Sequence, residues 1–516
     1  MLLGLALTAG VVARTWFLLH PAVVSAGEPD VHQADEGVVG LMGKHILEGR
    51  TYPVFFAGQN YLGALEAYLV AATATVLPAS MVAVRTVPYA FSLLLVPLVW
   101  WAARPLFGGP AGAVAAALVA LPSPFLLEWG LKARGGFIEH VVLSVLLVGL
   151  FARFTYGEER GWRTRLALGL VAGLAAWVNQ LVGTTLAVMA VVLWGRRGVD
   201  RGLAVAAVGF VVGAAPLLAH LARDPSAMPH ALGRKFFMLH RVQGPERYGD
   251  RRAVLGLGER VEALADGPRN VGVLLGLAAP PVEPPPAQRL LGVTPLALFA
   301  LGLAHCARRM RTGGWTGPHG LVLLLGLGVL AAGYHNPRYM LVGYPLAAMM
   351  AGAWWAAAAG RARRWAAALA AATVVVNGVG VTARAQAEAP DHRPLLEALA
   401  RVGCTRGYSA GPLYHLVYET GESLVLAPLQ KDRFPFYDAI VAAAADPCYV
   451  YRADQGDKRQ HERFLAGLQL AGISYRELDV PPYTVLHAFT PRARLTPALV
   501  ERARQAPGLV EQARQH

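Results

Sequence analysis

The sequence predicts an all-α polytopic membrane module of about eleven transmembrane helices, followed by a small soluble α/β domain. Three observations predict this fold class. The chain is too apolar for a soluble core, since 55% of its 516 residues are hydrophobic and only 16% are charged. Apolar runs recur from the N-terminus to residue 383, and most are long enough to cross a bilayer. After residue 383 the composition becomes that of a soluble domain.

The first helix is expected over Leu2 to Leu19, an apolar run interrupted by Arg14, and we interpret it as uncleaved. Further apolar runs predict helices at 85–103, 109–127, 137–155, 166–194, 203–221, 289–307, 320–334, 339–358 and 365–383. The run at 166–194 is long enough for two short helices, and we expect it to split near Asn179 and Gln180.

The arginines decide the topology. With this split, the Arg-rich loops at 160–165, 196–197, 308–311 and 361–364 all lie on one side of the membrane, which the positive-inside rule makes cytoplasmic. The net charge of +14 is therefore a topology signal, and it does not indicate nucleic-acid binding.

The run from Leu62 to Pro78 is the exception, because counting it as a span would invert every basic loop that follows. It is short and contains Glu66, so we expect a helix in the outer interface; an ordinary span is the alternative. The expected organisation is a membrane module over 1–383 with outer loops at 20–84 and 222–288, an extracytoplasmic α/β domain over 384–490, and a polar tail over 491–516.

The soluble domain shows two alternating patterns. Helical periodicity occurs at 394–402, 413–419, 435–444 and 458–471, and short strands are expected near 405–409, 423–427, 448–451 and 474–489. Cys404 and Cys448 each open a predicted strand, so one disulfide could form if these strands are neighbours. Unpaired thiols are the favoured interpretation.

The stretch from Asp35 to Arg50 is the strongest candidate for chemistry. Of two adjacent carboxylates at the mouth of a membrane protein, one can act as a base while the other orients a partner, or both can hold a cation. As a helix, the stretch has an apolar stripe suited to lying on the membrane, formed by Val38, Leu41, Met42, His45 and Ile46. Alternatively, Asp35 and Glu36 only cap this helix.

An aromatic and Gly-rich segment follows, from Val54 to Tyr68. Its polar residues are Gln59, Asn60, Tyr61 and Glu66. Hydroxyls of a sugar need hydrogen-bonding side chains and its ring faces pack on aromatics, so the segment suits a sugar. The alternative is that these are ordinary interfacial polar residues.

Two further segments carry charge at the outer side. The stretch from Glu128 to His140 contains Lys132, Arg134 and Glu139, and its cations suit a phosphate leaving group, although headgroup anchoring is the alternative. The element from Tyr334 to Tyr339 contains His335 and Arg338. Its arginine could bind a lipid-linked phosphate or snorkel to the interface.

Together and in this order, these segments resemble bacterial polyprenyl-phosphate-dependent glycosyltransferases of the GT-C superfamily, whose members include protein O-mannosyltransferases and the lipid A aminoarabinose transferase. The resemblance covers roughly residues 1–383 and implies a GT-C type membrane module. It implies a polyprenyl-phosphate sugar donor and a lipid, glycan or protein acceptor at the outer face of the cytoplasmic membrane. Membrane lipids are the remaining partners, and no nucleic acid is expected.

The resemblance also implies roles for individual residues. Asp35 would be the base that deprotonates the acceptor in an inverting transfer, and Glu36 would orient the acceptor or a metal. Lys132 and Arg134 would stabilise the departing phosphate, with Arg338 as a helper. The remaining candidates would contact substrate: Gln59, Asn60, Tyr61, Glu66, Glu128, Glu139, His140 and His335.

The chain departs from better-defined members of the superfamily in one respect. It has Glu128 and Glu139 where some members place an aspartate, so we assign neither a metal nor another cofactor. The main alternative function is a transporter or flippase of lipid-linked saccharides. Such proteins commonly show duplicated halves and charges at the membrane midplane, whereas this sequence shows no internal repeat and most of its charges lie at loop edges.

Overall fold

The computed structural model describes residues 2–20, 29–157, 161–196, 203–225, 267–276, 292–333, 336–385, 391–429, 433–452 and 458–491. The chain divides into two compact units. Unit 1 comprises residues 1–26, 54–66 and 85–388, and unit 2 comprises residues 27–53, 67–84 and 389–516. The N-terminal part of the chain therefore contributes to both units.

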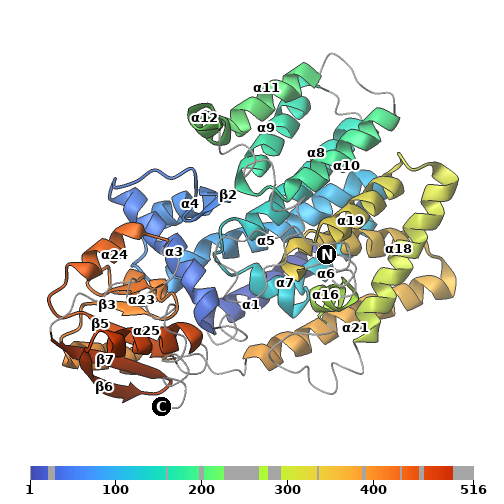
Figure 1. Ribbon diagram of the computed structural model, residues 1–516. Coiled ribbons are helices and arrows are strands. Elements are labelled where there is room, and N and C mark those ends of the chain that lie inside the picture. The colour runs from blue at the N-terminus through green and yellow to red at the C-terminus, as the bar shows by residue number, and fades with distance from the viewer. Residues whose placement is uncertain are drawn as a thin grey trace. The chain divides into compact units, whose positions relative to one another are not determined.

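Unit 1 is almost entirely helical (Figure 1). Its elements are α1 (Leu2–Leu19), β1 (Phe55–Phe56), β2 (Gln59–Gly63), α5 (Met81–Phe107, entering from unit 2), α6 (Gly109–Ala120), α7 (Pro124–Trp129), α8 (Phe137–Tyr156), α9 (Trp162–Val178), α10 (Val182–Gly195), α11 (Leu203–Gly213), α12 (Ala215–Arg223), α16 (Gly267–Leu275), α18 (Val293–Gly313), α19 (Pro318–Gly333), the 3-10 helix η3 (Pro337–Met340), α20 (Gly343–Ala357) and α21 (Gly360–Ala385).

Local sequence explains where several apolar runs break. The predicted split near Asn179 is confirmed: α9 ends at Val178, and the Asn179 side chain accepts a 3.1 Å hydrogen bond from the Leu181 backbone N–H. The run expected at 109–127 becomes α6 and α7, because two prolines lie at 122 and 124. The run at 203–221 becomes α11 and α12, which bend by 69° where Pro216 follows.

These breaks reduce the number of long helices. Among the described residues, four helices are long and apolar enough to cross a membrane: Leu2–Leu19, Met81–Phe107, Phe137–Tyr156 and Gly360–Thr382. The bent pair of α11 and α12 adds a fifth if it forms one span. The expected count of about eleven is therefore not reached, since the remaining apolar runs form shorter helices such as α6, α10 and α19.

A buried arginine joins the first helix to its neighbours in unit 1. The Arg14 side chain is only 1% exposed. Its guanidinium donates hydrogen bonds to the Ser92 hydroxyl at 2.9 Å and to the carbonyls of Ala120 at 2.8 Å and Val119 at 3.0 Å. A buried charge is tolerated when its donors are satisfied in this way, so the polar residue that interrupts the first apolar run is structural.

Unit 2 is a small α/β domain with two N-terminal helices. Its elements are α3 (Pro29–Leu47), α4 (Leu65–Thr73, whose first two residues belong to unit 1), α22 (Arg393–Arg401), β3 (Arg406–Ser409), α23 (Tyr414–Glu419), β4 (Val425–Pro428), α24 (Pro435–Ala442), β5 (Cys448–Arg452), α25 (Lys458–Leu470), β6 (Ser474–Val480) and β7 (Tyr483–Thr490). The four helices and first three strands expected after residue 390 are confirmed.

The five strands form one mixed sheet in the order β4-β3-β5-β7-β6. Strand β3 is parallel to both β4 and β5, whereas β7 is antiparallel to β5 and β6. The segment at 474–489 is therefore a hairpin rather than a single strand. Helix α4, at nine residues, is about 14 Å long, which is too short to cross a bilayer and agrees with a helix that does not span.

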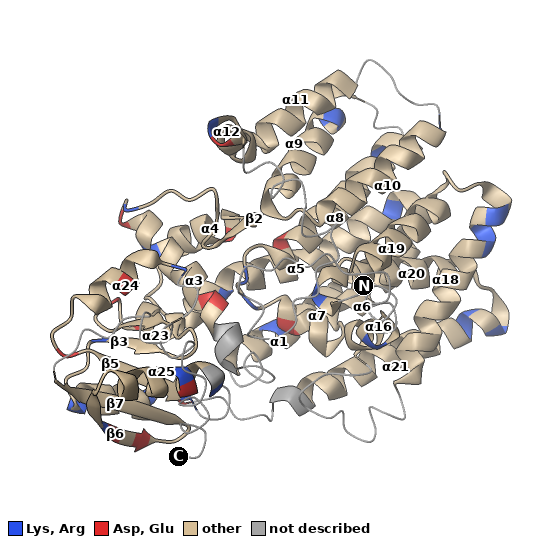
Figure 2. Ribbon diagram, in the orientation of Figure 1, with Lys and Arg blue, Asp and Glu red and all other residues tan. Residues whose placement is uncertain are grey.

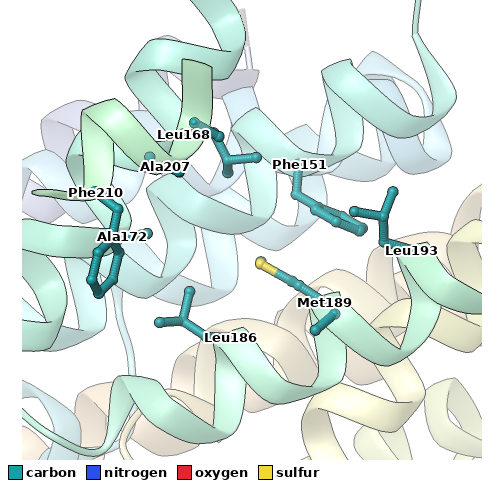
Figure 3. A pocket seen from close by; sticks show the side chains of 11 residues that line it. Phe151, Leu168, Ala172, Leu186, Met189, Leu193, Ala207 and Phe210 are labelled. Atoms are coloured by element: carbon teal, nitrogen blue, oxygen red, sulfur yellow. The ribbon is translucent and has the colours of Figure 1, made fainter. Parts of the chain in front are cut away.

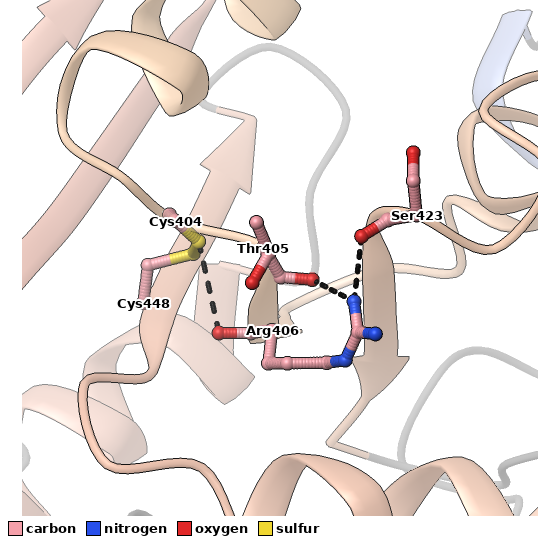
Figure 4. Close-up of a disulfide and its surroundings, with 5 residues drawn as sticks. All are labelled: Cys404, Thr405, Arg406, Ser423 and Cys448. Carbon is pink, nitrogen blue, oxygen red and sulfur yellow. Dashed lines mark hydrogen bonds between the residues drawn. A yellow bond between two sulfur atoms is a disulfide. The ribbon is translucent and has the colours of Figure 1, made fainter.

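The cysteines correct one expectation. Cys404 and Cys448 form a disulfide, with 5.9 Å between their Cα atoms (Figure 4). The favoured interpretation of unpaired thiols is wrong, because β3 and β5 are neighbours and Gly407 pairs directly with Cys448. A Cβ at residue 407 would lie 2.5 Å from the Cys448 sulfur, so glycine at this position leaves the room that the disulfide needs.

Candidate active site

One end of unit 1 gathers arginines. The Tyr156 hydroxyl and Arg196 Nη1 both donate to the backbone carbonyl of Thr316, at 2.8 and 3.4 Å. The ends of α8 and α10 and the turn before α19 therefore lie on one side, as predicted for their Arg-rich loops. In Figure 2, Lys and Arg positions also mark the last turns of α18 and the first turns of α21.

The predicted outer segments meet at the opposite ends of the same helices, where α8 begins and α9 ends. The carboxylate of Glu66 accepts hydrogen bonds from the backbone N–H groups of Gly135 and Gly136, at 2.6 and 3.2 Å. Leu62 forms a β-bridge with Asn179. Two segments that are about 70 residues apart in the sequence are thus joined at one place.

The turn that Glu66 holds requires glycine. Gly135 and Gly136 have φ angles of +77° and +89°, which disfavour any residue with a side chain. A Cβ at residue 136 would also lie 2.8 Å from the Val178 side chain. Glu66 is 1% exposed. Through Oε2 it therefore anchors the loop, and its contact with a substrate stays a prediction.

The two cations of this loop are both buried. Lys132 forms an ion pair with Glu128, one helical turn earlier, and these residues are 1% and 5% exposed. The Arg134 guanidinium lies over the Trp129 ring, 4.2 Å from its centroid, and Arg134 is 5% exposed. Two buried cations on one short loop give a basic, weakly hydrated environment of the kind that suits a phosphate group.

Aromatic rings connect this loop to Arg338 of η3. The Trp129 and Phe137 rings meet edge to face, with 5.2 Å between centroids, and Phe137 stacks on Tyr339 at 6.3 Å. Arg338 donates a 2.9 Å hydrogen bond to the Tyr339 hydroxyl, and its guanidinium lies 4.9 Å from the Tyr339 ring centroid. These aromatic contacts place Arg338 beside the second outer loop within unit 1, and its role toward a phosphate stays a prediction.

The remaining candidates of unit 1 differ in exposure. In β2, Asn60 is exposed and Gln59 and Tyr61 are half-buried, so these three can meet a ligand. In contrast, Glu139 and His140 are 0% and 3% exposed inside the first turn of α8. Their predicted contact with a substrate stays a prediction. His335 lies outside the described residues.

Helix α3 places Asp35 and Glu36 in unit 2. Because α3 begins at Pro29, both carboxylates lie beyond its first turn, and the capping alternative is wrong. Asp35 is partly exposed, and its Oδ1 lies 3.7 Å from Nη2 of Arg433, whereas Glu36 is fully buried. Asp35 is thus the accessible carboxylate of the pair.

The apolar stripe of α3 is not a membrane-facing surface. Val38, Leu41, Met42 and His45 are at most 2% exposed. The His45 ring packs edge-on against Phe434, with 5.5 Å between centroids. Periodicity correctly marked the buried face of α3, but the partner that covers His45 comes from the C-terminal domain.

An apolar cavity of about 250 Å³ lies among α8, α9, α10 and α11 of unit 1 (Figure 3). Its lining is entirely hydrophobic and includes Phe151, Met189, Leu193 and Phe210. None of the candidate residues contributes to it. The cavity cannot perform chemistry on a polar substrate, and it is separate from the loop that carries Lys132 and Arg134.

Comparisons with known proteins decide the fold. ArnT from Cupriavidus metallidurans bound to undecaprenyl phosphate superposes with a TM-score of 0.66 at 13% identity, over 95% of this chain and 99% of that one. The Archaeoglobus fulgidus oligosaccharyltransferase in its apo form gives a TM-score of 0.58 at 14% identity, over 90% of this chain and 70% of that one. The chain has a GT-C fold.

The GT-C fold is shared at very low sequence identity. A third structure, AglB from Archaeoglobus fulgidus in complex with an inhibitory peptide and a dolichol-phosphate, gives a TM-score of 0.52 at 14% identity, covering 94% of this chain and 74% of that one. No family model and no curated protein sequence matches the chain. The GT-C resemblance inferred from the outer segments is confirmed at the level of fold.

Two site residues escaped the sequence analysis. Arg433 and Glu422 contact the α3 segment from positions almost 400 residues away, in stretches of ordinary soluble composition. No motif marks either residue. Only the weak signal that Arg433 begins an aromatic stretch, Arg433 to Tyr437, sets it apart.

Proposed function

We propose that this chain is a membrane glycosyltransferase that moves a sugar from a polyprenyl-phosphate donor to an acceptor at the outer face of the cytoplasmic membrane. One observation carries the proposal: the loop with Lys132 and Arg134 is built into unit 1 by Glu66 and by aromatic contacts to Tyr339. This buried basic loop occurs in a fold shared with ArnT bound to undecaprenyl phosphate and AglB bound to dolichol-phosphate.

The chemistry divides between two groups of residues. Asp35 takes the proton from an acceptor hydroxyl, and the oxygen forms a bond to the anomeric carbon of the donor sugar. The bond between that carbon and the phosphate oxygen breaks, and its electron pair leaves with the polyprenyl phosphate. Attack opposite the leaving group inverts the anomeric configuration.

The departing phosphate needs positive charge where its negative charge develops. Lys132 and Arg134 supply it from the loop between α7 and α8, and Arg338 assists from η3. Glu128 neutralises Lys132 through their ion pair, which keeps a buried cation acceptable before the phosphate arrives. Gln59, Asn60 and Tyr61 are exposed or half-buried on β2 and are the side chains proposed to hydrogen-bond the sugar.

Two observations support the proposed location. The arginine-rich end of unit 1, near Thr316, lies at the opposite end of helix α8 from the loop that carries Lys132 and Arg134. The positive-inside rule therefore supports an outer position for this loop. The disulfide between Cys404 and Cys448 favours an oxidising, extracytoplasmic compartment for the C-terminal domain. We propose that the shorter apolar helices complete a module of about eleven crossings in the inner membrane.

The experiment that tests the function uses the full chain in membranes. Membranes containing it are incubated with radiolabelled hexosyl and pentosyl undecaprenyl phosphates, and label is followed into lipid, glycan and protein fractions. A transferase moves label to one fraction only when the chain is present. Movement of donor across the bilayer without any labelled product would instead support the flippase alternative.

A further inference from the structure

The carboxylate of Glu422 forms ion pairs with the cations at and just after the C-terminal end of α3. Lys44 Nζ lies 2.5 Å and Arg50 Nη1 3.0 Å from its Oε2. His45 Nε2 lies 3.1 Å from its Oε1, and the Tyr437 hydroxyl donates to the same oxygen at 2.8 Å. A single acidic side chain of the C-terminal domain therefore holds three residues of the N-terminal segment.

Two glycines allow the rest of α3 to pack closely on the same domain. A Cβ at Gly37 would lie 2.2 Å from the His415 backbone nitrogen, and one at Gly40 would lie 2.8 Å from the Tyr418 ring. Helix α3 thus packs directly on α23, and Glu422 follows α23 after a short turn. The glycines allow close packing of α3 on α23, while Glu422 holds the C-terminal end of α3 in place.

The environment of Glu422 favours the ionised form. Burial acts to raise the pKa of its carboxyl, but hydrogen bonds from His45, Lys44 and Tyr437 outweigh burial and hold this pKa far below its usual value. The residue also adopts a φ of +67°, a conformation that residues with side chains rarely occupy. Such a conformation persists where surrounding contacts determine it.

We propose that Glu422 is a positioning residue for the transfer reaction, acting through helix α3 on Asp35. The inference rests on the proposed role of Asp35 as the base. Asp35 and Lys44 lie on one continuous helix, nine residues or about 14 Å apart, so a shift at its C-terminal end moves the carboxylate. At its other end Asp35 faces Arg433, also from the C-terminal domain. The C-terminal domain therefore contributes to the reaction by setting the position of the proposed base.

The test compares Glu422→Gln with Glu48→Gln in the full chain in lipid nanodiscs. Glu48 is a matched control, because it pairs with the same two cations, Lys44 at 2.7 Å and Arg50 at 2.8 Å, but lies on the N-terminal segment itself. Three quantities are measured: the rate of amide hydrogen exchange in peptides covering α3, and kcat and KM for the undecaprenyl phosphate sugar that the wild type uses.

The expected result separates the two variants. Glu422→Gln speeds exchange in α3 by at least about tenfold and lowers kcat by about 10- to 100-fold, with the donor KM within about twofold of wild type. Glu48→Gln stays within about twofold in all three quantities. Glu422→Asp, which keeps the charge, restores part of kcat. If Glu422→Gln does not fold, Tyr437→Phe removes one of the four contacts and shifts the same quantities in the same direction.

Unchanged exchange in α3 would overturn the inference, and so would faster exchange with wild-type kcat. Failure of the proposed function gives a different pattern. In that case the wild type transfers no sugar from any donor, while the exchange measurement still reports whether Glu422 holds α3.

Discussion

The carboxylate of Glu66 accepts a 2.6 Å hydrogen bond from the backbone N–H of Gly135, and through this contact the first outer segment holds the loop that carries Lys132 and Arg134. The contact is buried and links residues 69 positions apart in the chain. We therefore expect the order of this loop to control how tightly a lipid phosphate binds.

Replacement of Glu66 tests that expectation. Glu66→Ala leaves two buried N–H groups without their acceptor, which costs about 1–3 kcal/mol for each, so we expect the affinity for undecaprenyl phosphate to fall at least about tenfold. Glu66→Gln keeps an oxygen at the same place and retains most of the affinity. Binding is measured by quenching of tryptophan fluorescence, since Trp129 lies under Arg134. Equal affinities for the alanine and glutamine variants would contradict the anchoring role.

The ion pair of Lys132 with Glu128 makes a second prediction. A lipid phosphate competes with the Glu128 carboxylate for the same ammonium group, so Glu128→Gln should tighten binding of undecaprenyl phosphate by about 3- to 10-fold. Lys132→Met should weaken it and also destabilise unit 1, because the buried Glu128 carboxylate loses the ammonium group of this ion pair. Weaker binding by Glu128→Gln would show that the pair only supports the fold.

The C-terminal domain should lose stability in mild acid. Burial lowers the pKa of His392 to about 4, and it lowers the pKa of His461 to about 4 as well. Both folded-state values lie below that of the unfolded chain, about 6.5. Below pH 6.5 the unfolded state therefore binds more protons than the folded state. The free energy of unfolding is unaffected by these histidines above pH 6.5, and it falls by about 1.4 kcal/mol per pH unit for each histidine between about pH 6.5 and pH 4.

Pulse proteolysis of the full chain in urea, repeated at several pH values, measures this loss. Replacing His461 by Phe removes one titrating group next to the Tyr449 and Tyr451 rings and should halve the pH slope. A slope that is the same in the variant would show that other groups cause the acid sensitivity.

The disulfide closes a loop of 44 residues within the C-terminal domain. Loss of such a cross-link should lower the free energy of unfolding of that domain by about 4 kcal/mol. We expect Cys404→Ala, Cys448→Ala and the double variant to show the same loss in pulse proteolysis, since each removes the same bond. A larger loss in the double variant than in either single one would indicate that the thiols stabilise the domain separately.

Local signals in the sequence predicted the elements of the fold well. Asn179 marks the split of the long apolar run, and hydrophobic periodicity located the C-terminal helices within about two residues. The breaks at prolines 122, 124 and 216 were not predicted, because the runs at 109–127 and 203–221 were expected to be single helices. The disulfide could not be decided, because the pairing of β3 with β5 depends on sheet order and not on local sequence.

The candidate site was only partly predictable for the same reason. Sequence chemistry singled out Lys132, Arg134 and Asp35 as charged residues at the outer side. It assigned Glu66 to substrate, although its acceptor geometry toward Gly135 exists only once the loop is folded. It missed Glu422 altogether, because the cations and the histidine of the α3 segment that contact this residue are 372 or more positions away. Contacts of this kind are set by tertiary structure and leave no periodic trace.

The most direct test of the proposed function measures sugar transfer by Asp35→Asn and Arg134→Ala in membranes, each expressed to the wild-type level. We expect Asp35→Asn to lower kcat by at least about 100-fold with unchanged binding of undecaprenyl phosphate, since only the base is lost. Arg134→Ala should lower both kcat and phosphate binding. Full transfer activity in both variants would contradict the proposed site.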